Sequence, residues 1–184
     1  EVEELVERVL RELERLVREN KESSDRIKEE LRKLVEDNEK SVRDTKRTAE
    51  KLVDDLRRKK DEERVEELAR RIAKTVEKLV EEDRKSVEDT IKRVEDLVRE
   101  DEKSVRDSVR KVRELVKRVE ENVKDERVVR KVREDVKRVE RLSKEIVDDS
   151  KREVEKVVET SRRIAEKSTD VVRRVKRELE EITR

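Results

Sequence analysis

Residues 85–98 read KSVEDTIKRVEDLV and residues 103–116 read KSVRDSVRKVRELV, so this stretch returns after 18 residues with its apolar positions kept. Eighteen residues make five turns of an α-helix with about 3.6 residues per turn, so each repeat presents the same face. A heptad repeat imposes a left-handed supercoil, and an 11-residue repeat imposes a right-handed one. The 18-residue period therefore predicts nearly straight helices.

The same period runs through the rest of the chain. The apolar residues that recur in this way are Leu16-Val17, Leu34-Val35 and Leu52-Val53; then Leu79-Val80, Leu97-Val98 and Leu115-Val116; and finally Val128, Ile146, Ile164 and Ile182. The repeat thus divides into three series, each of which occupies about a third of the chain.

An apolar stripe with helical spacing accompanies the repeat. In residues 2–17 the stripe consists of Val2, Leu5, Val6, Val9, Leu13, Leu16 and Val17, and similar stripes occupy residues 65–80 and 128–142. This one-sided pattern is typical of an amphipathic helix. A disordered chain or an isolated charged helix needs no such stripe. We therefore expect helices that bury these stripes against one another.

Two short charged segments mark the ends of the helices. Basic residues 57–60 precede acidic residues 61–63, and Lys124 precedes Asp125 and Glu126. Cations favour the C-terminal end of a helix and anions the N-terminal end, where Asp is a good N-cap. No turn is predicted near Asn20 or Asn38, because the stripe continues across both.

The sequence therefore predicts helices over approximately 1–59, 62–123 and 126–184, with turns near 60–61 and 124–125. Short connections force neighbouring helices to run antiparallel. The predicted fold is all-α: one domain over residues 1–184, an up-down-up antiparallel three-helix bundle with little supercoil. Each helix of roughly 60 residues would be about 90 Å long.

Polar residues interrupt each stripe in its middle. The three interrupted series are Val2, Asn20, Asn38, Leu56; Val65, Asp83, Asp101, Val119; and Val132, Ser150, Ser168. Folding the chain at its turns places Asn20, Asp101 and Ser150 at one level. By the same count Asn38, Asp83 and Ser168 share a second level.

Further hydroxyl residues lie on or beside the stripes near these two levels: Ser23, Ser41, Thr45, Ser86, Thr90, Ser104, Ser108, Ser143 and Ser161. A buried polar group is costly unless it is hydrogen-bonded. We therefore predict two buried polar layers whose members bond across helices.

The polar layers could instead form a metal, ligand or catalytic site. Di-metal bundles use several Glu residues with Glu-x-x-His pairs, and this chain has no His. One Asp per layer, Asp83 or Asp101, is a poor ligand set for a hard cation. A Ser/Asp pair also lacks the base that a nucleophilic Ser requires. We therefore predict a protein that is not an enzyme and has no catalytic, cofactor or metal site.

Charge and composition exclude further classes. Lys and Arg number 55 and Asp and Glu 54, so 59% of the residues are charged while the net charge is +1. This balance lacks the basic excess of a nucleic-acid-binding protein. No apolar run exceeds two residues, so we expect no transmembrane helix and no signal peptide. No targeting signal indicates a compartment.

One apolar series widens the stripe of the second helix. Ala73, Ile91 and Val109 are again 18 residues apart. They could form the edge of the core, or a shallow groove through which the chain self-associates or captures a partner helix. We expect a monomer that requires no partner, with a homo-oligomer as the alternative.

These features together resemble computationally designed helical bundles. The resemblance rests on an alphabet of eleven residue types, three equal segments, the 18-residue repeat and the Asn/Asp/Ser layers, and it covers the whole chain. More narrowly, the chain is similar to parametrically generated, untwisted bundles with buried hydrogen-bond networks. It departs from them in having no Gly or Pro for its turns and in being rich in Val. The resemblance implies a structural scaffold or a test of design principles, with no natural biochemical function.

Overall fold

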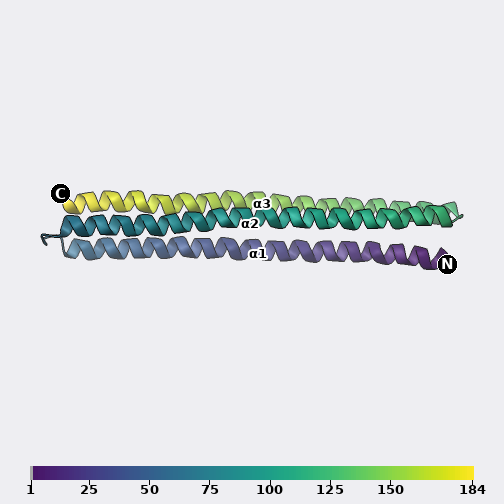
Figure 1. Ribbon diagram of the computed structural model, residues 1–184, viewed down its shortest axis with the longest axis horizontal. Coiled ribbons are helices and arrows are strands. Elements are labelled where there is room, and N and C mark those ends of the chain that lie inside the picture. The colour runs from purple at the N-terminus through teal and green to yellow at the C-terminus, as the bar shows by residue number, and fades with distance from the viewer. Residues whose placement is uncertain (1) are drawn as a thin grey trace. The chain divides into compact units, whose positions relative to one another are not determined.

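The computed structural model describes residues 2–184, which form three α-helices joined by two connections (Figure 1). The helices are α1 (Val2–Arg58), α2 (Val65–Asn122) and α3 (Glu126–Thr183), and no strand occurs in residues 2–184. The predicted all-α three-helix fold is therefore confirmed. Helix α1 continues without interruption through Asn20 and Asn38, where the unbroken stripe predicted no turn.

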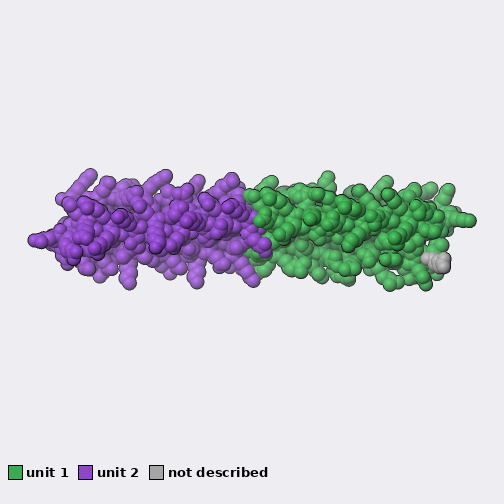
Figure 2. Space-filling view, in the orientation of Figure 1, with its two compact units in different colours: residues 1–30, 94–155 green, residues 31–93, 156–184 purple. Residues whose placement is uncertain are grey.

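The chain consists of two compact units, coloured separately in Figure 2. Unit 1 comprises residues 1–30 and 94–155, and unit 2 comprises residues 31–93 and 156–184. Each unit contains one segment of each helix, and each is described below by itself.

In unit 1, ion pairs between α2 and α3 define the register. Arg133 pairs with Glu120 at 2.8 Å, Arg113 with Glu140 at 2.9 Å, and Lys151 with Glu102 at 2.9 Å. Each step forward along α3 is matched by an equal step backward along α2. The two helices therefore run antiparallel at a constant register through this unit.

The core of unit 1 is built almost entirely from Val and Leu. Its buried members are Val9, Leu13, Leu16, Val112, Val119, Val123, Val132, Val136 and Val139. Val has a lower helix propensity than Ala, because its branched side chain loses rotamer freedom in a helix. The helices of this unit must therefore draw their stability from burial and not from intrinsic propensity.

The core of unit 2 differs by including small residues. Its main cluster contains Ala49, Val53, Leu56, Ala69, Val76, Val80, Val171, Val175 and Leu179. Ala73 packs against this cluster, and Ala165 packs against the smaller cluster of Val42, Val87 and Ile164. All four Ala residues of the chain thus lie in unit 2.

The first connection occupies residues 59–64, so α2 begins three residues later than the predicted start at residue 62. Backbone bonds from Glu62 N to Lys59 O (3.0 Å) and from Val65 N to Glu62 O (3.3 Å) continue the chain as tight turns. Residues 59–64 are all charged and exposed, so nothing there can be buried. The helix starts only at Val65, which packs against the core of unit 2.

The second connection is shorter and ends at a well-formed N-cap. The side-chain carboxylate of Asp125 accepts a hydrogen bond of 3.0 Å from the backbone N–H of Arg127. Its carbonyl oxygen accepts the first helical bond, from Val129 N at 3.2 Å. Asp125 thereby satisfies an amide at the start of α3, as expected of an Asp N-cap.

Candidate functional site

The six residues predicted to form the polar layers are all buried, and they divide between the two units. Asn20, Asp101 and Ser150 lie in unit 1, and Asn38, Asp83 and Ser168 lie in unit 2. Each unit therefore contains one buried polar group from each of its three helices. The hydrogen bonds of the two groups differ.

In unit 1 the three predicted residues have three different partners. The amide of Asn20 donates to the hydroxyl of Ser143 at 3.0 Å, and Ser23 donates to Asp101 Oδ1 at 2.7 Å. These two bonds join α1 to α3 and to α2, respectively.

The third polar contact of unit 1 joins Ser150 to a residue that the sequence analysis did not identify. The hydroxyls of Ser24 and Ser150 share a hydrogen bond of 3.1 Å, in which either can donate. One 18-residue step beyond Ser24 lies Val42, a core residue, so the repeat itself indicated that position 24 faces inward. Helices α1 and α3 run parallel here, since both α1–α3 bonds advance together along the two helices.

In unit 2, Asp83 lies at the centre of the polar group. Its Oδ1 accepts a hydrogen bond from Ser41 at 2.7 Å. Its Oδ2 accepts bonds from Thr45 at 2.7 Å and from Ser168 at 3.1 Å. Hydroxyls of α1 and α3 therefore converge on one carboxylate of α2. Hydrogen bonds to an ionised carboxylate are stronger than those between neutral groups.

Asn38 forms the second part of the polar group in unit 2. Its amide nitrogen donates to Thr90 Oγ1 at 2.8 Å, and its amide oxygen accepts from Ser86 at 2.9 Å. Both partners lie on α2, one turn apart. Together with Ser41 and Thr45 at Asp83, these bonds hold α1 antiparallel to α2 in this unit.

One buried hydroxyl in unit 2 has no counterpart to the bonds of unit 1. Among residues 2–184, Ser161 is fully buried and its hydroxyl has no hydrogen-bond partner. In the repeat, Ser161 is to Asn38 as Ser143 is to Asn20. Because Asn38 directs its amide to Thr90, Ser161 remains unsatisfied.

These arrangements use polar side chains to satisfy one another. Hydroxyls and amides of one helix meet acceptors of the next, and no His or Cys is present in the sequence to act as a base or nucleophile. In the described part of the chain, no group of three or more His, Cys, Asp or Glu residues is placed to hold a metal ion. No helix in residues 2–184 is long and apolar enough to cross a membrane.

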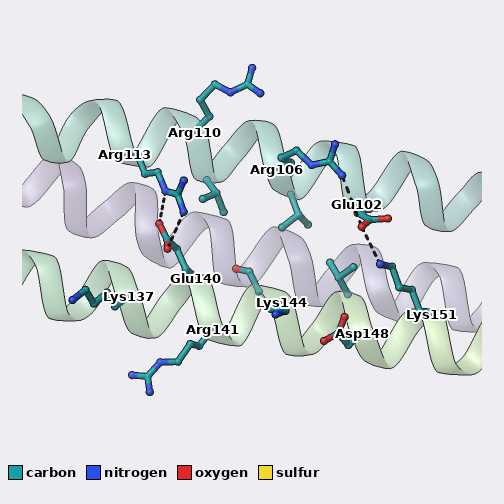
Figure 3. A pocket seen from close by; sticks show the side chains of 14 residues that line it. Glu102, Arg106, Arg110, Arg113, Lys137, Glu140, Arg141, Lys144, Asp148 and Lys151 are labelled. Carbon is teal, nitrogen blue, oxygen red and sulfur yellow. Dashed lines mark hydrogen bonds and ion pairs between the residues drawn. The ribbon is translucent and has the colours of Figure 1, made fainter.

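The three residues of the predicted edge have different surroundings. Ala73 lies beside a shallow pocket of unit 2, and Ile91 packs against the cluster of Val42, Val87 and Ile164. Val109 lines an open groove of about 910 Å³ between α2 and α3 of unit 1 (Figure 3). All three are half-buried.

Ion pairs bridge this groove at both ends (Figure 3). Arg113 donates two hydrogen bonds to Glu140, of 2.9 and 3.3 Å, and this hydrogen bonding together with the charge of Glu140 raises the pKa of Arg113. At the other end Glu102 lies 2.9 Å from Lys151 and 3.8 Å from Arg106. The groove is therefore bounded by charge pairs that join α2 to α3.

No protein-family model matches the chain, and no curated protein matches it. Among solved structures, the chain is similar to one described as a computationally designed three helix bundle, with 15% sequence identity and a TM-score of 0.41. The match covers 99% of this chain and 85% of the other.

Proposed function

We propose that this chain is a designed structural scaffold, a three-helix bundle whose buried polar groups determine how its helices pair and which carries out no chemistry. The observation that supports this most directly is the set of bonds around Asp83. Both of its carboxylate oxygens are occupied by hydroxyls of the neighbouring helices, Ser41, Thr45 and Ser168. A carboxylate bound in this way has a structural role.

The repeat explains why such a protein needs polar groups. Near-identical 18-residue units could pair equally well after one helix slips by a whole repeat. A slip of α1 against α2 would bring Leu5 to the place of Ser23 beside Asp101. The buried carboxylate would then lose its hydroxyl donor, at a cost of about 1–3 kcal/mol or more for a charged group. The polar groups thereby disfavour the slipped pairing.

The proposal of a designed origin rests on the sequence. The chain uses eleven residue types, it lacks Gly and Pro even in its connections, and it repeats one 18-residue pattern in all three helices. Natural structural coiled coils are the nearest biological analogue, but they sustain heptads. The 18-residue period of this chain does not.

The test is to make the polar group of unit 1 apolar. The variant Asn20→Leu, Ser24→Val, Asp101→Leu, Ser143→Val and Ser150→Val leaves no buried polar partner unpaired, so it should melt no lower than the parent. We expect it to populate several helix registers. Because the chain has no Cys, a single pair of introduced cysteines on α1 and α2 can carry spin labels.

Double electron–electron resonance should then give one distance in the parent and a broadened or multiple distribution in the variant. Ser104→Ala, which changes an exposed hydroxyl, is the matched control and should keep the single distance. A variant that keeps one register and is clearly less stable would contradict the proposal, because the polar group would then supply stability and not register.

A further inference from the structure

Two exposed leucines lie on the same face of unit 1. Leu10 on α1 is 36% exposed and Leu142 on α3 is 40% exposed. Both line a groove of about 530 Å³ between α1 and α3, together with Leu13, Val17 and Val139. We call these five residues the leucine face. A contiguous exposed apolar patch on a folded protein is typical of an interaction site.

The leucines are exceptions to the repeat. At 18-residue steps, the position of Leu10 is occupied by Lys28 and Lys46, and that of Leu142 by Lys124, Thr160 and Glu178. In unit 2, Glu178 lies 3.8 Å from Arg57, an ion pair at the place where unit 1 has Leu142 and Lys21. The bundle therefore forms elsewhere with polar residues at both positions. Packing of the chain's own core does not require these leucines.

The charges around the leucine face are segregated along its length. The hydrogen bond between Asn20 and Ser143 fixes the level of α3 against α1, and it places Asp135 near the level of Leu10 and Leu13. Glu14 also lies toward that end, whereas Arg18 and Lys21 lie toward Leu142. One end of the face is therefore acidic and the other basic. Arg138, 3.6 Å from Asp135, partly offsets the charge of the acidic end.

We propose that the leucine face binds a second copy of this chain in an antiparallel arrangement. A two-fold axis across the face brings the acidic end of each copy onto the basic end of the other and covers the leucines of both. A parallel arrangement would place like charges together. The mixed charge of the face also gives no preference for an anionic or a cationic ligand, whereas a reversed copy matches it at both ends.

The groove is short, so this interface lies at the small end of the range for protein pairs. Association should therefore depend on concentration. Sedimentation equilibrium of the full chain should give a molar mass that rises from 22.3 kDa toward twice that value as concentration increases. A mass of 22.3 kDa at every concentration would overturn the proposal.

The matched variant replaces the leucines by the residues found two repeats further on, Leu10→Lys and Leu142→Glu. It should remain at the mass of one chain at all concentrations, with helicity and Tm unchanged by circular dichroism. Val2→Lys is the control, because Val2 is 41% exposed but lies outside the leucine face, and it should dimerise like the parent. Dimerisation of the leucine variant at parental strength would place the interface elsewhere.

A charge exchange tests the orientation. Glu14→Lys with Asp135→Lys makes the face basic throughout, and Arg18→Glu with Lys21→Glu makes it mainly acidic. Each variant alone should lose association at least tenfold, and an equimolar mixture should recover it as a heterodimer. No recovery on mixing would exclude the antiparallel arrangement. None of these substitutions alters the buried polar groups, so this result is independent of the scaffold proposal.

Discussion

Units 1 and 2 are built on the same repeat but satisfy their buried carboxylates differently. Among residues 2–184, Asp83 of unit 2 accepts bonds from three hydroxyls, whereas Asp101 of unit 1 accepts one, from Ser23. Two substitutions within the repeat distinguish the units. Thr45, which donates to Asp83, corresponds to the apolar Ile27, and Ser24, which bonds Ser150, corresponds to Val42.

The comparison teaches that one backbone repeat can support two kinds of polar cluster. Unit 2 concentrates its donors on a single charged acceptor, and unit 1 divides its polar residues into separate pairs. Concentration makes each member depend on the others, because removing a donor affects the carboxylate that they share. Separate pairs can fail one at a time. The following four predictions test this difference, from the largest expected effect to the smallest.

Removing all three donors to Asp83 should have the largest effect. The variant Ser41→Ala, Thr45→Val, Ser168→Ala leaves a buried carboxylate without these hydroxyls, and the free energy of unfolding should fall by about 3–5 kcal/mol. Guanidinium chloride denaturation measures this loss. Adding Asp83→Leu to the same variant should recover most of it, because no polar partner is then left unpaired. If the loss remains, the carboxylate is not its cause.

In unit 1, Asn20→Leu should cost about 1–3 kcal/mol by leaving Ser143 without its donor. The level count alone would assign that cost to Asp101, but the structure gives Asp101 a bond from Ser23 and gives Ser143 the bond from Asn20. A double-mutant cycle separates the two. Asn20→Leu should couple to Ser143→Ala and add independently to Ser23→Ala. Coupling to Ser23→Ala instead would show that the polar residues of unit 1 act as one network.

The two corresponding serines of α3 should respond in opposite directions. Ser143→Ala should destabilise unit 1 by about 1 kcal/mol, because it removes the acceptor of Asn20. Ser161→Ala should be neutral or slightly stabilising, because the buried hydroxyl it removes has no partner. Thermal unfolding followed by circular dichroism compares the two. Equal destabilisation by both would show that Ser161 acquires a partner in solution.

Surface ion pairs between α2 and α3 should have the smallest effect. Arg113→Ala in unit 1 and Lys176→Ala in unit 2 each remove one exposed partner, of Glu140 and of Glu77. Each should lower the free energy of unfolding by no more than about 1 kcal/mol. The bidentate Arg113 pair should contribute the larger share, and 1 M NaCl should reduce both contributions. Salt-independent losses would indicate packing of the side-chain stems.

The sequence predicted the helices well because the apolar stripe is a local and continuous signal. It placed all six polar-layer residues on the stripe, and the structure buries every one of them. It could not predict the bonds between them. Knowing that Asn20 and Asp101 share a level leaves several hydroxyls within a turn of each, and side-chain rotamers decide among them. The start of α2 was missed because Asp61 is a good N-cap type, while the nearest residue with apolar surface to bury is Val65.

The first connection has a consequence for proteolysis. Residues 57–64 are exposed, and Arg57, Arg58, Lys59, Lys60 and Arg64 fall within or directly beside the one connection that has no apolar residue to hold it. Trypsin cleaves after Lys and Arg, and it requires a stretch of backbone that can leave its helical conformation. Its first cut should therefore fall in this segment and not among the many Lys and Arg residues inside the helices. The capped connection at Asp125 should be cut later.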